Sequence, residues 1–590
     1  MFLYDEFTDM TRFRNLLVLM IAALLAASCS AEIDPVEVQV DGDPVVVDYG
    51  EQHELDSIDL SAMVVMFEGR LDADDQFSVG VNQVIDAEVY AGPDEQAGDP
   101  HWVTRIQLLD DEGQRLWGRR INSLHQLLEA MNLALREFVP IDVGVGPLFD
   151  IVLDDYPELL EFAVKVPSEI DGAHRLVMEV EDREGSGDWR RIADYSFENL
   201  SELAEEPDVG IDYEIDALVE SGPPRDRINV AILGDGYTAT ERSEFEGDAQ
   251  AISDALIGTS PFKEHADLFN IRTIWTPSNE SGAGYDCNHG NADDDCVQKF
   301  RDTPFETTFV IPALGDQYDF PTDDITDRVA MPLQLAKIYE LASLAHYDEI
   351  ILISNTDKFS GFAGLYIAVV TNYDDRDRFV ETAVHEVGHT LGLLGDEYTN
   401  PIDPCMDNEP AIPLPANIGR LEGDAVKWDE WFSGDTPIPT PSYLSHRHDV
   451  GAFQGAYNCD HLVRPADNCK MNSSREEFCS ICAEQMVRRF YAEVPTATSD
   501  PATVSVDRGR GVTLSVPVRQ QSRHRYTVEW TVDGEPFGSD FDSITLRDDD
   551  LSGDDWTTVT ATVRNDTEFI RTPDADIESH FQFEVRPSQQ

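Results

Sequence analysis

The sequence predicts a multidomain protein in which a central α/β domain stands between two β-rich domains. Three observations support this. At 590 residues the chain is too long for one hydrophobic core, since domains typically hold about 100–200 residues. Hydrophobic residues make up 41% of the chain, enough to form packed cores. Strand and helix patterns alternate between residues 222 and 496, whereas short strand patterns separated by turn residues occupy both flanks.

Residues 1–29 have the pattern of an export signal. An unbroken apolar run from Leu16 to Ala27 follows Arg12 and Arg14. The run has twelve residues, whereas a membrane-spanning helix needs about 20, so we expect a signal-peptide core and not an anchor helix. The run ends at Cys29 in a sequence that resembles a bacterial lipoprotein cleavage box. We therefore expect export with lipidation at Cys29, on the bacterial cell surface or outer membrane, or alternatively ordinary cleavage nearby and secretion.

Residues 30–57 are acidic and suit a tether, and residues 58–215 predict an N-terminal β-sandwich domain. Within the sandwich, a helical stretch is expected at Ser123–Phe138 because its apolar residues follow helical spacing. The acidic segment Glu198–Asp216, with Gly222-Pro223-Pro224 after it, is typical of a linker. Short β-rich runs recur in the sandwich, for example at Ala62–Phe67, Trp102–Leu108 and Arg175–Val180.

Residues 222–496 predict a mixed sheet covered by helices. Its strands are expected at Ile228–Leu233, Ile271–Thr276 and Glu349–Ser354. Its helices are expected at Thr240–Ile257 and Asp327–His346, and a further helix begins near Arg378.

Residues 497–590 return to β character. A tryptophan, Trp530, sits in a central strand, and the turn Asp533-Gly534 follows it, which favours an immunoglobulin-like β-sandwich. The expected strands are Thr503–Val506, Val512–Val518, Tyr526–Val532, Ile544–Leu546, Thr557–Arg564 and Phe581–Val585.

The chain is strongly acidic, with 115 Asp and Glu against 42 Lys and Arg and a formal net charge of −73. Nucleic-acid binding needs clustered Lys and Arg, and the sequence has no such cluster, so that class is excluded. An acidic surface repels itself at low salt, so we expect folding and activity to depend on salt or calcium. The alternative is a solvated surface that only aids solubility.

Seven cysteines follow Cys29, and export makes disulfides the default. Cys287 and Cys296 are expected to form a local pair, and the other five lie between residues 405 and 482, which leaves room for one free thiol. The alternative for this group is a second zinc site, since two of its members have the Cys-x-x-Cys spacing of zinc ligands, formed by Cys459, Cys469, Cys479 and Cys482.

A His-Glu-x-x-His motif marks the candidate active site. His385 and His389 are four residues apart, so on a helix both imidazoles lie on one face and can hold one zinc ion. Glu386 then lies beside the metal and can act as general base toward its water. A chance pair of surface histidines is the alternative, but the apolar neighbours of the motif predict a buried helix, with Gly388 allowing close approach of a neighbouring segment.

A catalytic zinc needs a third protein ligand, and Asp396 is the candidate. It lies eleven residues after His385, and a straight helix would carry it about 16 Å away. If the helix ends near Gly392, the chain can fold back and bring Asp396 to the metal. Glu397 is the reserve, and capping or surface exposure of these carboxylates is the alternative.

The segment from His385 to Tyr398 resembles the zinc helix of the IgA-peptidase family of metallopeptidases, family sixty-four in peptidase nomenclature, which is grouped with the metzincins. The likeness extends over roughly residues 225–495. It includes Leu233–Thr238, Ser260-Pro261-Phe262, Phe269-Asn270, Glu280-Ser281-Gly282, Asn417, Lys427-Trp428, Arg464-Pro465, Cys469-Lys470-Met471 and Phe478–Cys482.

The resemblance implies a metzincin-like fold with a methionine turn beneath the zinc, where Met471 is the expected occupant and an ordinary core methionine the alternative. It also implies that Phe362–Thr371 is an edge strand that holds substrate by main-chain pairing. Two positions depart from the family pattern. Gly395 stands where a typical metzincin has its third ligand, and Val463 stands where the family often has Tyr before Arg-Pro. A tyrosine that stabilises the oxyanion is therefore sought elsewhere, at Tyr398 or Tyr457.

Taken together, the sequence predicts an exported zinc metalloendopeptidase that acts on protein or peptide substrates and reaches a membrane only through its lipid anchor. The alternative is a non-catalytic adhesion or binding lipoprotein with a retired protease domain. Both histidines and the glutamate are present, whereas retired enzymes usually lose one of them.

Overall fold

The structure is a computed structural model. It describes residues 62–68, 78–85, 104–121, 162–167, 172–181, 189–198, 210–286, 299–309, 330–364, 367–399, 414–420, 426–457, 459–494, 502–506, 512–516, 518, 525–539, 542–547, 550–551, 556–571 and 578–587. Leu60–Met486 belong to one compact unit and Val487–Gln590 to a second. The export signal with Cys29, the tether at 30–57, the helix expected at Ser123–Phe138 and the pair Cys287 and Cys296 lie outside the described residues.

The first unit is built around a six-stranded mixed sheet in the order β12-β13-β11-β9-β10-β8. Its parallel centre consists of β9 (Ile228–Asp235), β10 (Phe269–Trp275), β11 (Glu349–Ser354) and β13 (Ile367–Thr371). Every residue of β9, β11 and β13 is buried. Continuous apolar runs of this kind form strands that are covered on both faces, as the sequence predicts.

Both outer strands run antiparallel to their neighbours, and both differ from expectation. The run predicted as one edge strand, Phe362–Thr371, is two strands: β12 (Gly361–Gly364) forms the edge, and β13 lies inside it. At the other edge, β8 (Glu214–Val219) pairs with β10. The linker expected at Glu198–Asp216 was therefore wrong at its C-terminal end, where Glu214–Asp216 form the start of β8. An edge strand pairs through its backbone and tolerates exposed acidic side chains.

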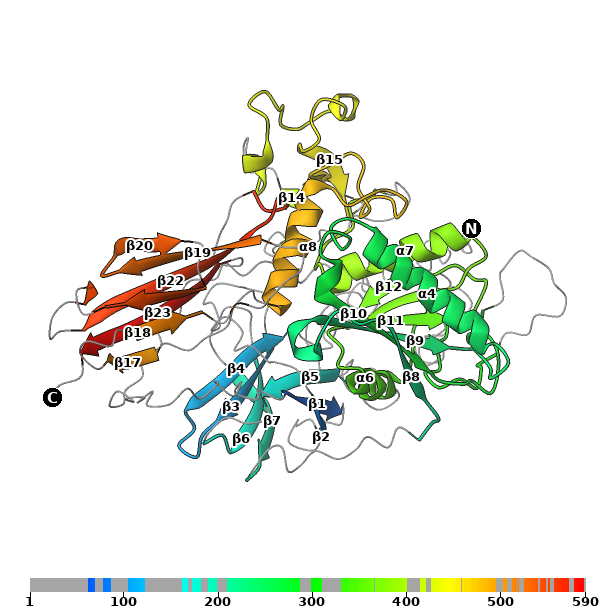
Figure 1. The fold of residues 1–590 in the computed structure, drawn as a ribbon. Coiled ribbons are helices and arrows are strands. Elements are labelled where there is room, and N and C mark those ends of the chain that lie inside the picture. The colour runs from blue at the N-terminus through cyan, green and yellow to red at the C-terminus, as the bar shows by residue number, and fades with distance from the viewer. Residues whose placement is uncertain are drawn as a thin grey trace. The chain divides into compact units, whose positions relative to one another are not determined.

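Helices cover the sheet (Figure 1), with α4 (Arg242–Gly258) and α7 (Arg376–Thr390) packed against each other on one face and α6 (Leu335–Leu344) on the other. The prediction placed the start of α6 too early, at Asp327. Instead Met331 exchanges backbone hydrogen bonds with Thr308. Pro332 explains this, because a residue before proline favours extended backbone.

Two further sheets in the first unit come from the N-terminal segment. One has the order β2-β1-β5, from β1 (Ala62–Glu68), β2 (Ser78–Ile85) and β5 (Phe162–Pro167). The other has the order β4-β3-β6-β7, from β3 (Thr104–Leu109), β4 (Arg115–Ile121), β6 (Arg175–Glu181) and β7 (Trp189–Ser196). All three strands predicted by name in this segment form, each shifted by no more than two residues at either end.

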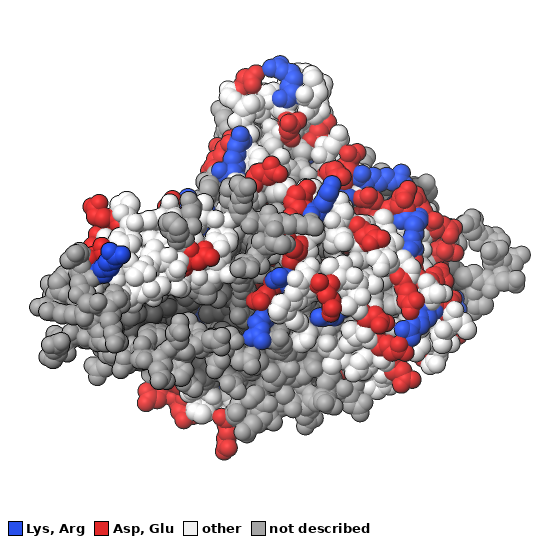
Figure 2. Space-filling view, in the orientation of Figure 1, with Lys and Arg blue, Asp and Glu red and all other residues white. Residues whose placement is uncertain are grey.

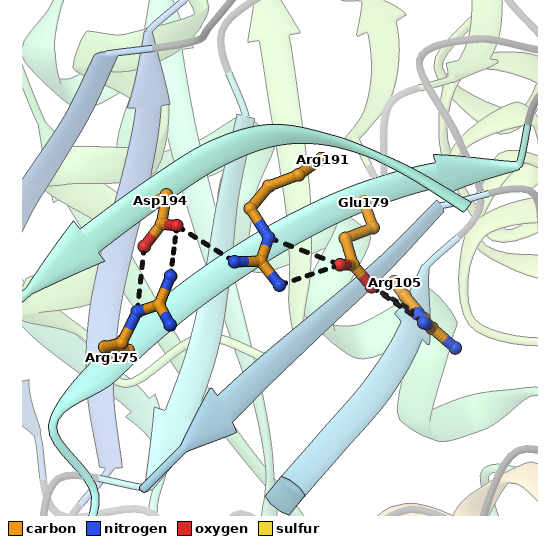
Figure 3. A network of polar contacts seen from close by, with 5 residues as sticks. All are labelled: Arg105, Arg175, Glu179, Arg191 and Asp194. Carbon is orange, nitrogen blue, oxygen red and sulfur yellow. Dashed lines mark hydrogen bonds and ion pairs between the residues drawn. The ribbon is translucent and has the colours of Figure 1, made fainter. Parts of the chain in front are cut away.

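An ion-pair chain crosses the four-stranded sheet (Figure 3). Arg191 contacts Glu179 at 3.1 Å and Asp194 at 3.0 Å, Arg105 contacts Glu179 at 2.7 Å, and Arg175 pairs with Asp194. Burial acts to raise the pKa of Asp194, but the hydrogen bonds from Arg175 and Arg191 lower it overall. Both carboxylates of this ion-pair network, those of Glu179 and Asp194, therefore have guanidinium partners.

The second unit is a β domain. A five-stranded sheet has the order β17-β23-β22-β19-β20, and β18 pairs with β21 in a separate ladder. All six strands predicted here form, and the structure adds a further strand, β20 (Glu535–Ser539). Trp530 is buried and stacks on Phe583. The strand bounds are Ala502–Val506 (β17), Val512–Ser515 (β18), Arg525–Val532 (β19), Ser543–Leu546 (β21), Thr557–Asp566 (β22) and Glu578–Pro587 (β23).

Acidic side chains are scattered over the visible face of the described residues, with Lys and Arg interspersed among them (Figure 2). Among the residues that the structure describes, no helix is both long and apolar enough to cross a membrane.

Candidate active site

The candidate site is carried by α7. Asp375 caps the helix by accepting a hydrogen bond from the backbone N–H of Arg378 at 3.2 Å, as a short acidic side chain at this position commonly does. The helix packs against β12 and β13. Its apolar side chains are buried as predicted, which places the motif inside the protein, with Phe379, Ala383, Val384 and Val387 each no more than 1% exposed.

Three side chains from two segments meet at one point. The Nε2 atoms of His385 and His389 lie 3.1 Å apart. Oδ1 of Asp396 lies 3.3 Å from Nε2 of His385 and 3.2 Å from Nε2 of His389. Ligands bound to one zinc at about 2.0–2.1 Å in tetrahedral directions stand roughly 3.3 Å apart, so these three atoms have the separation that one zinc ion requires.

The other nitrogen of each imidazole fixes its orientation. Nδ1 of His385 donates to the carbonyl oxygen of Lys470 at 2.8 Å, and Nδ1 of His389 donates to that of Leu394 at 2.7 Å. With the protons on Nδ1, both Nε2 atoms present lone pairs, and two lone pairs cannot hydrogen-bond to each other. Oδ1 of Asp396 has no hydrogen bond of regular geometry to a described residue. A shared cation satisfies all three atoms.

The end of α7 brings Asp396 back to the histidines. The helix stops at Thr390, and Leu393 adopts a positive φ of 53°, which reverses the chain. Asn417 then holds the returning segment, since it accepts a hydrogen bond from the N–H of Gly395 and donates to its carbonyl oxygen, each at 2.8 Å. The chain folds back just after Gly392, as expected, but the positive φ falls on Leu393 and not on Gly392 or Gly395.

Glu386 lies beside the three ligands. Burial raises its pKa to about 8; the charge of His385 opposes the rise and that of Asp396 adds to it. The edge strand β12 passes close by, because a Cβ at Gly361 would lie 2.5 Å from Oε1 of Glu386. Gly361 is a site residue that the sequence did not reveal, because its importance depends on a contact between strand and helix.

Charges in the cluster are coupled. Burial alone would lower the pKa of His389, but the charge of Asp396 and the contacts with Asp396 and Leu394 raise it. Burial alone would raise the pKa of Asp396, but both histidines hold it well below its usual range. The described residues around the cluster therefore keep Asp396 as a carboxylate, the state in which it can bind a metal.

Met471 lies under the motif. A Cβ at Gly388 would stand 2.8 Å from the sulfur of Met471 and 3.1 Å from Cε1 of Phe478. The close approach expected at Gly388 is thus made by the residue predicted for the methionine turn. Met471 is fully buried, and its carbonyl oxygen accepts a hydrogen bond from the N–H of Glu397 at 2.8 Å.

The two candidate tyrosines lie near the cluster but differ in their surroundings. Tyr398 hydrogen-bonds to Asp396, and the charge of Asp396, burial and that hydrogen bond raise its pKa well above the usual value. Tyr457 is 2% exposed and its hydroxyl lies against Gly395. Tyr398, with 38% of its surface exposed, is the more accessible of the two.

Glu397, the reserve ligand, lies in a different cluster from Asp396. Its Oε1 accepts a hydrogen bond from Asn417 at 3.0 Å and lies 3.2 Å from the sulfur of Cys482. Cys459, which the sequence grouped with the three later cysteines as a possible zinc set, is disulfide-bonded instead.

Comparison with known proteins agrees with this geometry. Residues 216–447 match the model of the family described as IgA Peptidase M64, which confirms the resemblance seen in the motif. The match covers β9 to α7 together with Asp396, and it ends before Met471 and the last four cysteines, Cys459, Cys469, Cys479 and Cys482. No protein of curated function matches the chain. The matched segment is therefore a peptidase domain that carries a candidate metal site.

Proposed function

We propose that this chain, whose central segment matches the IgA-peptidase family, is an exported zinc metalloendopeptidase with a metzincin-like catalytic domain. The family match supports a peptidase that acts on protein or peptide substrates. The observation that carries the metal assignment is the convergence of two imidazole lone pairs and one carboxylate oxygen, all between 3.1 and 3.3 Å apart. The proposed ligands are His385, His389 and Asp396.

The strand order supports the metzincin-like part of the proposal. Four parallel strands with an antiparallel strand at the edge nearest α7 form the sheet beside the motif. In this arrangement β12 is the edge strand, and among the described strands it has no partner on its outer side. We infer that substrate adds to β12 as a further strand, with its main chain bonded to that edge.

Bound at this site, zinc would polarise the scissile carbonyl and lower the pKa of water to about 7. The carboxylate of Glu386 takes the proton of the attacking water and passes it to the nitrogen of the leaving amine. We propose that the hydroxyl of Tyr398 donates a hydrogen bond to the developing oxyanion. Lys470 and Leu394 hold the two imidazoles through their carbonyl oxygens, and Met471 supports the helix between them.

The test is cleavage of denatured casein by the purified full-length chain at several salt and calcium concentrations. We expect cleavage that a zinc chelator such as 1,10-phenanthroline abolishes and added zinc restores. Cleavage that persists after the chelator has removed all metal would contradict the proposal. Folded, zinc-loaded protein that cleaves neither casein nor a peptide library would favour the adhesion lipoprotein with a retired protease domain.

We also propose that the chain is exported and lipidated at Cys29, on the strength of the apolar run before it. Mass spectrometry of the membrane fraction of an expressing bacterium would find a diacylated N-terminal cysteine. An unlipidated chain that begins elsewhere and lies in the medium would leave secretion by ordinary cleavage.

A further inference from the structure

A second group of metal-binding side chains lies behind the candidate active site. The sulfur atoms of Cys469, Cys479 and Cys482 and a carboxylate oxygen of Glu397 all lie within 4.8 Å of one another. All three cysteines are free thiols, and Cys469, Cys482 and Glu397 have no solvent exposure. The four residues of this cysteine–glutamate cluster come from two segments, and none of the four has a role in the proposed catalytic mechanism.

The distances in the cluster fit a tetrahedral ion. The sulfurs of Cys469 and Cys482 lie 3.6 Å apart, and that of Cys482 lies 3.2 Å from Oε1 of Glu397. Two thiolates at about 2.3 Å from one zinc stand roughly 3.8 Å apart, and a thiolate and a carboxylate oxygen roughly 3.6 Å apart. The side chains are therefore already gathered to within a few tenths of an ångström of that geometry.

An independent observation also points to an ion. Oε2 of Glu397 is buried and has no hydrogen-bond partner among the described residues. A buried carboxylate oxygen without a partner costs about 1–3 kcal/mol or more, and a metal bond removes that cost. A disulfide between two of the three thiols cannot replace the ion, because it would leave the third thiol and Oε2 of Glu397 without a partner.

A backbone N–H group also contacts the cluster. The N–H of Cys479 points to the sulfur of Cys469 at 3.4 Å. Helix α8 (Ser480–Glu493) begins directly after Cys479 and carries Cys482 in its first turn. The N–H groups and positive end of a helix stabilise anionic sulfur, as hydrogen bonds around a metal site commonly do.

We propose that Cys469, Cys479, Cys482 and Glu397 bind a structural zinc ion, distinct from the catalytic one. Four protein ligands close the coordination sphere, so this ion takes no substrate. Thiolates select zinc over calcium or magnesium. The ion fixes two segments that the active site needs: residues 396–397, and the loop 469–471, in which Lys470 orients His385 and Met471 underlies Gly388.

The experiment uses the full-length chain with His385→Ala and His389→Ala together, which removes two of the catalytic ligands and leaves the cluster intact. Metal analysis and zinc X-ray absorption are the readouts. We expect about one zinc per chain with sulfur neighbours at about 2.3 Å, against two zinc ions in the unmodified chain. Because neither readout requires activity, the result does not depend on the proposed peptidase function.

Within that double variant, Glu397→Gln is expected to weaken zinc affinity at least tenfold. Glu476→Gln is the control, since it removes an exposed carboxylate from the loop between Cys469 and Cys479 and is expected to change nothing. If the double variant does not fold, cobalt substitution of the unmodified chain replaces it, with thiolate-to-cobalt charge-transfer absorption as the expected signal. Zinc bound only by nitrogen and oxygen, no zinc, or an alkylation mass showing a disulfide between two of these cysteines would overturn the proposal.

Discussion

Asp396 and Glu397 are neighbours in the chain but belong to two clusters of different character. Asp396 meets two histidines at 3.2 and 3.3 Å, beside Glu386 and the edge strand β12. Glu397 lies with three cysteines in a fully enclosed set. The first cluster supplies three ligands, the number typical of a catalytic zinc site, whereas the second supplies four, the number typical of a structural one.

The ion-pair chain of the N-terminal sheet sharpens this comparison. There, Arg191 and its neighbours give both carboxylates a charged partner, and the network is complete without any added ion. In the two clusters of the peptidase domain, the carboxylates of Asp396 and Glu397 each keep one buried oxygen without a hydrogen bond from the described residues. An unpaired buried oxygen calls for an explanation, and beside other metal-binding side chains a bound ion supplies one.

The largest effect is expected from Asp396→Ala. Loss of the third ligand should release the catalytic zinc and reduce casein cleavage to the level of a blank, while the zinc of the cysteine–glutamate cluster stays bound. Metal analysis and a cleavage assay check this together. Asp377→Ala, at an exposed position in the first turn of the same helix, is the control and should leave both unchanged. Full activity of the Asp396 variant would remove Asp396 from the proposed ligands.

Tyr398→Phe should lower kcat by about 10²–10³-fold with zinc retained, because it removes a hydrogen-bond donor to the oxyanion. KM should change much less. Steady-state kinetics on a fluorogenic peptide would measure both. A kcat equal to that of the unmodified chain would show that the hydroxyl has a structural role only.

Gly388→Ala should destabilise the first unit by about 1–3 kcal/mol, because the new methyl group would press on Met471 and Phe478. Gly247→Ala in α4 is a matched control, since its Cβ meets no atom within 4 Å. That variant should be about 0.4–1 kcal/mol more stable. Urea unfolding curves would separate the two, and equal stabilities would argue against a close contact under the motif.

Arg191→Ala should have the smallest effect. The ion pairs it removes are partly exposed, and such pairs are each worth about 0–1 kcal/mol. We expect a small loss of stability that shrinks further at high salt, with cleavage activity unchanged. A loss of activity would show that this sheet influences the active site.

The local parts of the site could be predicted from the sequence. Spacing placed His385 and His389 on one face of a helix, and the apolar neighbours of the motif predicted that this helix is buried. The glycines after the motif suggested the fold-back that brings Asp396 to the histidines. These features depend on residues close together in the chain. The central strands were also recognisable, because strands buried on both faces have continuous apolar sequences.

Features that depend on distant segments could not be predicted. The sequence could not tell that Glu397 would take the fourth place beside three cysteines, because that requires the loop after Cys469 to pass behind α7. It could not show which half of Phe362–Thr371 is the edge strand, since both halves are equally apolar. The acidic strand β8 was hidden for a similar reason, because its pairing with β10 depends on backbone hydrogen bonds and not on side-chain pattern.

The most direct test of the central claim is Glu386→Gln, assayed for zinc content and casein cleavage on the same preparation. The substitution keeps the size of the side chain and removes the carboxylate that moves the proton. We predict unchanged zinc and a loss of cleavage of about 10²–10⁴-fold or more, the contribution typical of a general base. Cleavage at the unmodified rate in a zinc-loaded variant would contradict the account.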